Sequence, residues 1–583
     1  MLLVPFCGEN YSEGKAIKVY SLIPLNQLPL KGVKMKHILL LVSFLSAALF
    51  SPAIAQEMHP HRHERPEKLG TVNFSTSCSP KAQKQFNHAV AWLHSFEYEE
   101  AEKAFTEVAA TDPQCGMAYW GIAMSNYHPL WVPPTPVELK KGWNAVEKAK
   151  AAGQKTQREQ DYIAAIELFY KDHDKLDHRA RAFAYSDAMK QLHTRNPTDR
   201  EAGVFYALTL IATGMMSPGK TYEREKQAAQ ILNDVLAREP QHPGVSHYLI
   251  HSYDYPALAQ LALPAARSYA KIAPASAHAQ HMPSHIFTRL GLWPEAIRSN
   301  LDAHAAAKAF AARNKMTGAW DEQIHAMDYL AYAYLQRAQD KHAAGVLDEL
   351  RNIQKVEPQT FKVAYAYTAI PARYVLERRQ WSDAAKLSLP EEEWKDFPWQ
   401  RFPWATSHIH FARAIGAARS GDIATARTAV DKLEAIRQAL SEVKGEYDWA
   451  KQVDIQRMIA LAWLQHAEGK DEEALRQLRA AADLDDATDK HPVTPGSIFP
   501  AREQLGELLL ELKQPAEALK EFEASFRNTP ERFNGIYGAA RAAKMAGDQK
   551  AAKAYYTKLL ALAREADTTR SEIEEARAVC RQR

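Results

Sequence analysis

The sequence predicts an all-α protein, built as a solenoid of about ten helical hairpins. Three observations support this fold class. The chain has 583 residues, more than one compact core can hold, so it forms either several domains or an extended repeat array. Glycine is scarce at 24 residues, and alanine-rich stretches such as Ala305–Ala307 favour helices over strands. Residues of matching type also return every 34 positions along the chain.

The clearest copy of the repeat lies near the start of the array. It has small residues, Ala89 and Ala101, at repeat positions 8 and 20, and large apolar residues, Trp92 and Phe105, at positions 11 and 24. Pro113 follows at position 32. Small residues let two helices approach closely, large ones fill the space to the next hairpin, and proline ends the second helix. These positions resemble the tetratricopeptide (TPR) consensus, and the resemblance implies a right-handed solenoid.

The same pattern returns further along the chain. Gly506 and Phe522 occupy positions 8 and 24 of a later copy, while Gly421 and Gly469 lie in turns between paired helices. The resemblance to TPR proteins covers most of residues 81–565. Further copies centre on a small residue at position 20, at Ala228, Ala262, Ala296, Ala343 and Ala384.

The repeats and the segments between them suggest a division of the chain. We expect an extension plus signal peptide (1–55), a disordered or extended linker (56–78), N-terminal repeats with a proline-rich insert (79–240), central repeats with a histidine-rich groove (241–390), an aromatic insert (391–405), C-terminal repeats (406–570) and a tail (571–583). The aromatic insert either lines a ligand surface or seals the solenoid between repeats.

The N-terminal segment has the pattern of a secretory signal peptide. Lys34 and Lys36 precede an apolar run over residues 38–50, and Ala53–Ala55 forms a small-x-small cleavage site. The apolar run is too short to span a bilayer as a stable helix. We therefore expect a start at Met35, cleavage after Ala55 and a periplasmic protein; an uncleaved anchor is the alternative. No later segment is apolar enough to cross a membrane.

Two further features bear on compartment and partners. The 73 basic and 70 acidic residues nearly balance, so nothing in the charge indicates a nucleic-acid partner. In an oxidising compartment Cys78 and Cys115 either pair as a disulfide or remain separate thiols.

Two His-x-x-x-His pairs recur one repeat period apart. His247 and His281 both fall at position 5, and His251 and His285 both fall at position 9. A spacing of four residues places both rings of a pair on one helix face, and stacking of the repeats lays one pair beside the other.

The TPR resemblance implies that positions 2, 5 and 9 of each first helix line a concave groove. Eight residues of the central repeats are predicted there: His247, His251, His278, His281, His285, His325, Asp328 and Tyr332. Asp254 follows the first pair closely enough to reach the same region.

Clustered imidazoles suit metal binding, with His247, His251, His281 and His285 as the predicted ligands and zinc or copper as the metal. Imidazoles titrate near neutral pH, so clustered histidines also suit general acid–base catalysis. In the protonated form they suit the binding of an anionic ligand. Pro283 interrupts the second pair, so the helix either begins there or is kinked. The residue after His247 is Tyr248, so the general base of a zinc peptidase is missing from its expected place.

The leading hypothesis is an exported interaction module whose groove binds a peptide, a partner protein or a small ligand. The alternative is a metal-binding protein or metal-dependent enzyme centred on the two histidine pairs, and a purely structural role is the third. Residues 242–300 and His491–Gly496 resemble a widespread group of exported bacterial TPR proteins. That resemblance implies the fold and no particular chemistry.

Overall fold

The computed structural model describes residues 68–581, except residues 131, 154, 218, 444 and 446. The predicted start at Met35, the signal peptide and the cleavage after Ala55 lie outside the described residues. Among the described residues every helix is too short or too polar to cross a membrane.

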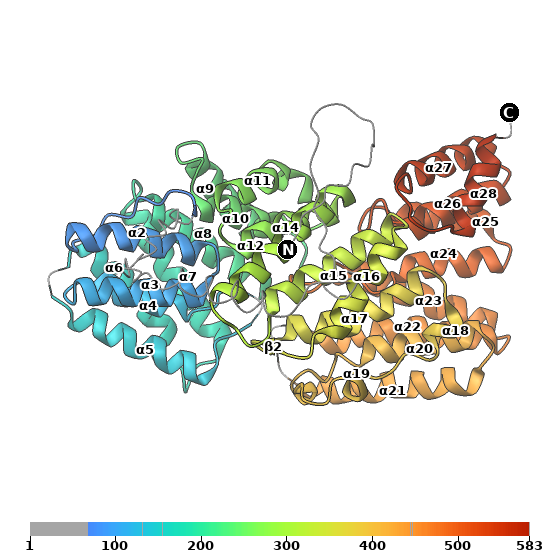
Figure 1. Ribbon diagram of the computed structural model, residues 1–583, viewed down its shortest axis with the longest axis horizontal. Helices are drawn as coiled ribbons and strands as arrows, with labels where there is room; N and C mark the ends of the chain where they lie inside the picture. Colours follow the sequence, from blue (N-terminus) through green and yellow to red (C-terminus); the bar gives the residue numbers. More distant parts are fainter. Residues whose placement is uncertain are drawn as a thin grey trace, which may run out of the picture. The chain divides into compact units, whose positions relative to one another are not determined.

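Helices account for nearly all the regular structure of the described residues (Figure 1). The N-terminal part contains α2 (Pro80–His94), α3 (Tyr98–Thr111), α4 (Gly116–Ser125), α5 (Pro136–Ala151), α6 (Gln157–Tyr170), α7 (His178–Arg195), α8 (Arg200–Met215) and α9 (Glu223–Leu236). The central part contains α10 (Pro243–Tyr253), α11 (Ala259–Ile272), α12 (Ala277–His281), α13 (Pro283–Arg289), α14 (Trp293–Arg313), α15 (Asp321–Gln336), α16 (Asp340–Asn352), α17 (Phe361–Glu377) and α18 (Trp381–Ala384). The C-terminal part contains α19 (Pro390–Glu393), the 3-10 helix η2 (Trp399–Arg401), α20 (Ser407–Arg419), α21 (Ile423–Ser441), α22 (Trp449–Ala467), α23 (Asp471–Ala487), α24 (Ala501–Glu511), α25 (Pro515–Ser525), α26 (Phe533–Met545), α27 (Gln549–Leu562) and α28 (Ser571–Arg581).

Consecutive helices pack as hairpins, such as α2 with α3, α8 with α9 and α20 with α21, and each hairpin packs on the next. The predicted all-α solenoid of TPR-like hairpins is therefore confirmed. Two short parallel strands, β1 (Ala319–Trp320) and β2 (Val356–Glu357), are the exception within the described part of the chain.

Close approach of paired helices explains the small residues of the repeat. A Cβ atom placed on Gly506 would lie 2.8 Å from the ring of Phe522, which is shorter than any ordinary contact. The aromatic ring thus fills the space that the glycine leaves. Three turn glycines, Gly421, Gly469 and Gly547, adopt positive φ angles of 83°, 77° and 86° after the first helix of a hairpin. Glycine adopts this left-handed conformation without the strain that a Cβ atom causes.

An extended segment precedes the first helix and packs against the repeats. Leu69, Val72 and Phe74 are buried, and the Phe74 ring contacts the rings of Phe86 and Trp120. Residues 69–78 of the predicted linker are therefore ordered, because their apolar side chains complete the core of the first repeats.

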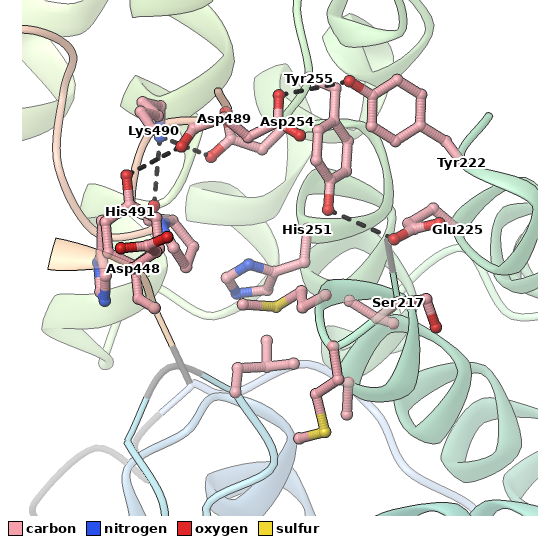
Figure 2. A pocket seen from close by; sticks show the side chains of 18 of the residues that line it. Ser217, Tyr222, Glu225, His251, Asp254, Tyr255, Asp448, Asp489, Lys490 and His491 are labelled. Atoms are coloured by element: carbon pink, nitrogen blue, oxygen red, sulfur yellow. Dashed lines mark hydrogen bonds and ion pairs between the residues drawn. The ribbon is translucent and has the colours of Figure 1, made fainter. Parts of the chain in front are cut away.

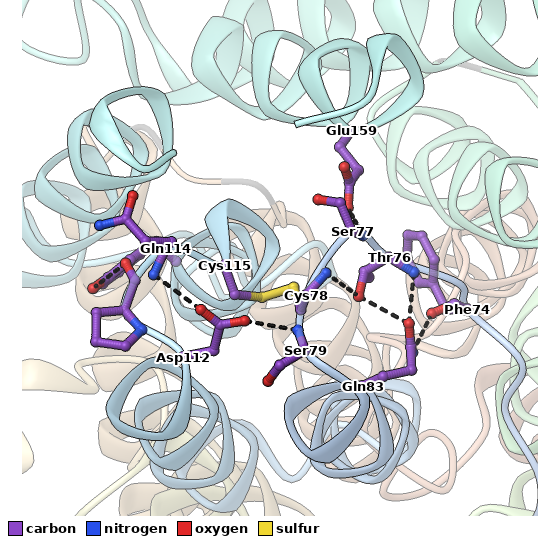
Figure 3. Close-up of a disulfide and its surroundings, with 12 residues drawn as sticks. Phe74, Thr76, Ser77, Cys78, Ser79, Gln83, Asp112, Gln114, Cys115 and Glu159 are labelled. Carbon is purple, nitrogen blue, oxygen red and sulfur yellow. Dashed lines mark hydrogen bonds between the residues drawn. A yellow bond between two sulfur atoms is a disulfide. The ribbon is translucent and has the colours of Figure 1, made fainter. Parts of the chain in front are cut away.

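A disulfide joins this segment to the beginning of α4 (Figure 3). Cys78 bonds to Cys115, the residue that immediately precedes α4. Next to it, the Ser79 backbone N–H donates to the Asp112 carboxylate at 2.7 Å. The Ser77 backbone N–H donates to Glu159 at 2.6 Å, so both the covalent bond and hydrogen bonds hold the segment in place.

The other non-repeat segments also pack into the fold. The aromatic residues of the 391–405 insert are buried, and the Trp404 ring stacks on Trp449 at 4.1 Å. Most of the predicted 571–583 tail forms α28, whose Ile573 and Ala576 are buried against α27 and its neighbours. This amphipathic helix covers the apolar end of the last hairpin, as terminal repeats of solenoids must.

Candidate metal centre

The histidines of interest lie on the first helices of three consecutive repeats. Helix α10 carries His247 and His251, the pair α12 and α13 carries His278, His281 and His285, and α15 carries His325. The beginnings of these helices are fixed locally: the His242 side chain caps α10 and the Ser276 side chain caps α12. All six imidazoles are buried.

The first group consists of His247, His251 and His278. The Nε2 atom of His247 lies 3.0 Å from Nε2 of His251 and 3.1 Å from Nε2 of His278. On the other side of its ring, His247 Nδ1 lies 2.7 Å from the backbone carbonyl oxygen of His94. A carbonyl oxygen only accepts hydrogen bonds, so Nδ1 carries the hydrogen of the neutral ring and Nε2 presents one lone pair. One lone pair cannot accept two good hydrogen bonds from the two flanking nitrogens. A cation among the three nitrogens could instead be bound by all of them.

The second group consists of His281, His285 and His325. His281 Nδ1 donates to the Asn300 side-chain oxygen at 2.7 Å, and His285 Nδ1 donates to Asp254 Oδ2 at 3.0 Å. Both neutral rings therefore present lone pairs at Nε2, and these two atoms lie 3.1 Å apart. Two facing lone pairs repel unless an electropositive atom lies between them.

Tyr329 is the one described side chain whose hydroxyl reaches a nitrogen of the second group. Its oxygen lies 3.3 Å from His285 Nε2 and 3.1 Å from the Val493 carbonyl oxygen. A hydroxyl has one hydrogen, so it cannot satisfy both acceptors. The lone pair of His281 would still face that of His285.

The spacing of the nitrogens agrees with a bound transition metal. The ligand nitrogens within each group of three all lie within 4.8 Å of one another. A tetrahedral zinc ion about 2.0–2.1 Å from each nitrogen would hold them about 3.3 Å apart. The hydrogen bonds from Nδ1 to an amide, a carboxylate or a carbonyl are those that orient metal-bound histidines.

Burial keeps these imidazoles in the neutral form that binds metals. It lowers the pKa of His247 to about 3. Burial likewise lowers the pKa of His285, although the neighbouring Asp254 carboxylate opposes the shift. Since protonated imidazole cannot bind a metal, neutral rings at pH 7 leave the Nε2 atoms available as ligands.

The helix is interrupted at Pro283, as the sequence indicated. Helix α12 ends at His281 and α13 begins at Pro283, with Met282 between them in a helical conformation. Because the backbone of Met282 stays helical, the break does not separate His281 from His285. The break therefore leaves the two imidazoles close to each other, with their Nε2 atoms 3.1 Å apart.

A third buried cluster contains His94, His242 and Glu201. His94 Nε2 lies 3.0 Å from one oxygen of Glu201, and His242 Nε2 lies 2.9 Å from the other. His242 Nδ1 accepts the backbone N–H of Val245, so its Nε2 carries a hydrogen and donates to Glu201. Here hydrogen bonds within the protein satisfy the polar atoms without a cation.

The structure distributes the eight predicted groove residues differently from the sequence prediction. Four histidines were predicted as ligands of one site, whereas the six imidazoles form two groups, to which His278 and His325 contribute the third members. Asp328 pairs with Arg373, and the Tyr332 hydroxyl accepts from Arg532 at 2.7 Å, so neither belongs to a histidine group. Nothing in the repeat pattern indicated Asn300 as a hydrogen-bond partner of a histidine.

A cavity of about 270 Å³ borders the first group (Figure 2). His251 lies on its wall beside Asp254 and Lys490, and Figure 2 shows Tyr255 and Glu225 on the same cavity. Leu130, Ile211, Met215 and Met216 form an apolar part of the wall. Asp254 thus both contacts the cavity and orients His285 of the second group.

The chain's own segment 488–500 occupies inner positions of the central repeats. Lys490 Nζ lies 3.1 Å from Asp254, and Arg373 donates to the Gly496 carbonyl oxygen at 2.7 Å. Tyr329, already described, approaches Val493 of the same segment. Asp254, which was expected to reach the groove, therefore binds a part of this protein.

No protein-family model matches the chain, and no curated protein matches it either. Among solved structures, the human IFIT1 dimer with m7Gppp-AAAA is 13% identical over 77% of this chain and 90% of that chain, with a TM-score of 0.37. A monomeric IFIT1 mutant with Gppp-AAAA is also 13% identical, over 83% of this chain and 100% of that chain, at a TM-score of 0.36. The complex of Naa15 and Naa10 bound to HypK has a TM-score of 0.22 at 12% identity, over 86% of this chain and 91% of that chain. Similarity this low says nothing about activity or partners.

Proposed function

We propose that this protein binds transition-metal ions, zinc or copper, at two neighbouring three-histidine centres. The observation that carries the proposal is the 3.1 Å contact between Nε2 of His281 and Nε2 of His285. Both rings have committed their hydrogen to a partner on the opposite side, so a cation is the simplest group that stabilises the contact.

The donor set supports these metals. Imidazole nitrogen suits zinc, copper, nickel and iron, and three ligands leave a coordination position for water or another small molecule. Such a position is compatible with either a metal carrier or a metal-dependent enzyme. The geometry favours metal binding itself and does not select a reaction.

The binding of a ligand in the concave face is a second candidate function, supported by the cavity beside His251. The cavity has room for a small molecule, and its lining combines the polar groups of Asp254 and Lys490 with apolar side chains. The contacts of Tyr329 and Arg373 with backbone carbonyls of segment 488–500 are of the kind that would hold an extended peptide. A peptide would have to displace this segment first.

We propose the periplasm as the compartment in which the protein works. The signal-peptide pattern around Met35 and Ala55 supports this location, and so does the Cys78–Cys115 disulfide, because cytosolic thiols are normally kept reduced.

The test is the metal content of the purified protein, measured by elemental analysis after reconstitution with zinc or copper and removal of excess ions. We expect two ions per chain. His247→Ala/His278→Ala and His281→Ala/His325→Ala should each lose one ion, because each double substitution removes two of the three ligands of one group.

A buried histidine outside both groups provides the control. His408 Nδ1 is 2.9 Å from the Thr368 hydroxyl, so His408→Ala changes a comparable environment without touching a proposed ligand. Its metal content should equal that of the parent protein. A correctly folded parent that holds no zinc or copper after reconstitution refutes the proposal.

A further inference from the structure

The two histidine groups lie close to each other, so metal ions bound in them would be close enough to share a ligand. His251 belongs to the first group and His285 to the second, and their ring centroids are 6.4 Å apart at an angle of 67°. Helices α10 and α13, which carry these two residues, pack directly against each other. The ions that His251 and His285 help to hold would therefore be neighbours.

Electrostatics then calls for an anion near the two ions. Two divalent cations and six neutral imidazoles would place four positive charges in a buried site, and an uncompensated buried charge is strongly unfavourable. The nearest carboxylate of the second group, Asp254, also forms ion pairs with Arg289 and Lys490. The negative charge of Asp254 is therefore already compensated by these two cationic side chains.

The Glu97 side chain near the first group is engaged in hydrogen bonds. Glu97 accepts hydrogen bonds from the Ser276 hydroxyl at 2.7 Å and from the His278 backbone N–H at 3.4 Å. It therefore lies behind the backbone of a ligand-bearing residue. Aromatic rings cover other parts of the group, with Phe96 4.4 Å from His247 and Tyr269 stacked on it at 5.0 Å.

A small molecule can approach from the cavity. Of the six histidines, His251 alone contributes to the cavity wall among the described residues, and Asp254 and Lys490 lie beside it (Figure 2). Asp254 on this wall accepts a hydrogen bond from His285 of the second group, so the cavity touches residues that belong to or bind both groups. Phe96 and Tyr269 do not line the cavity.

We propose that the two groups act as one dinuclear metal centre that binds a small anion, such as hydroxide or azide, between its ions. The inference rests on the proposed metal-binding function and adds to it that the two ions are coupled. In two-metal sites the ions are about 3.5–4 Å apart, a separation at which they share a bridging ligand.

The experiment is reconstitution of the full chain with Cu²⁺, followed by elemental analysis and electron paramagnetic resonance. We expect two copper ions per chain but a signal that integrates to well below two spins, because neighbouring Cu²⁺ ions couple magnetically. Acid denaturation should restore the full two-spin signal, which shows that the missing intensity was not reduced copper. Azide should change the spectrum or the visible absorption of the loaded protein.

Variants test the coupling between the two ions separately from the binding of metal. His281→Ala/His325→Ala should leave one copper ion with a full one-spin signal, while His408→Ala should keep the coupled pair. Met216→Trp, a substitution on the cavity wall at a residue that is not a proposed ligand, should slow azide binding without changing the copper content.

Two bound ions that together give two full, uncoupled spins overturn the dinuclear centre and leave metal binding intact. A single copper ion per parent chain also overturns it. Absence of bound copper and zinc overturns both proposals.

Discussion

Two sets of buried histidines in the same solenoid differ in how the nitrogens of their rings are paired. In the His94–Glu201–His242 cluster a carboxylate lies between two imidazoles, and every nitrogen has a hydrogen-bond partner within the protein. In the second three-histidine group the nitrogens that meet, Nε2 of His281 and Nε2 of His285, are both acceptors. The comparison shows that burial and proximity of histidines do not by themselves indicate a metal. What distinguishes the two cases is which ring nitrogens carry a hydrogen and which present a lone pair.

Acid should have the largest effect, and it should affect the buried imidazoles at a higher pH than the Glu201 carboxylate. Burial lowers the pKa of His247 to about 3, from an ordinary value of 6.5, and burial also lowers the pKa of the other five imidazoles. The stabilisation from neutral imidazoles is therefore complete above pH 6.5 and decreases as the pH falls below it. Each imidazole that is protonated only on unfolding lowers the free energy of unfolding of the metal-free protein by about 1.4 kcal/mol per pH unit.

The Glu201 carboxylate should respond at lower pH, whereas His94 beside it, whose pKa burial also lowers, should respond together with the six imidazoles. Burial alone would raise the pKa of Glu201, but His242 and His94 outweigh it and hold the pKa below its usual range. Its stabilisation is present above the ordinary value of 4.5 and decreases as the pH falls further. Urea unfolding at a series of pH values should show a first loss of stability below pH 6.5. A metal-free protein equally stable at pH 7.5 and 5.5 contradicts this assignment.

Glu201→Ala should have the next largest effect, on stability alone. It leaves the imidazoles of His94 and His242 buried without their shared acceptor, and breaking a buried pair in this way costs about 3–5 kcal/mol. The free energy of unfolding from urea titration measures the loss. Metal content should stay at the parent level, since Glu201 belongs to neither three-histidine group.

The matched control is Glu349→Ala at a more exposed pair. Glu349 lies 3.0 Å from His304, and its side chain is 36% exposed. Solvent screening should limit the loss to about 1 kcal/mol or less. Loss of a metal ion in Glu201→Ala would show that the two regions are not distinct.

Asp254→Asn should weaken metal binding by about 10–100-fold, the usual effect of removing the hydrogen-bond partner of a metal-bound histidine. An amide accepts more weakly than a carboxylate, so His285 becomes a poorer ligand. Competition with a coloured chelator measures the change. Asp489→Asn alters the same cavity wall without contacting a histidine of either group and should match the parent.

Tyr329→Phe should have the smallest effect. If a metal occupies the second group, the Tyr329 hydroxyl is free to donate to Val493, and its removal costs about 1 kcal/mol of stability. Thermal unfolding of the metal-loaded variant and parent gives the comparison. A large loss of stability together with unchanged metal content would mean that Tyr329, and not a cation, satisfies His285.

The sequence by itself determined the repeat architecture, because each hairpin is specified by local residues. Small residues such as Gly506 and large ones such as Phe522 are spaced so that one fills the space left by the other. The same periodicity placed the two histidine pairs at equivalent positions of neighbouring repeats.

Only the tertiary structure decided which histidines form a group and which atoms carry hydrogens. The contact of His247 with the His94 carbonyl joins residues 153 positions apart, and that of Lys490 with Asp254 joins residues 236 positions apart. Repeat positions define the face on which a side chain lies, but not what a distant segment places opposite it. Because a hydrogen-bond partner at Nδ1 determines what Nε2 can bind, the chemistry of these histidines depends on contacts that arise only when the repeats stack.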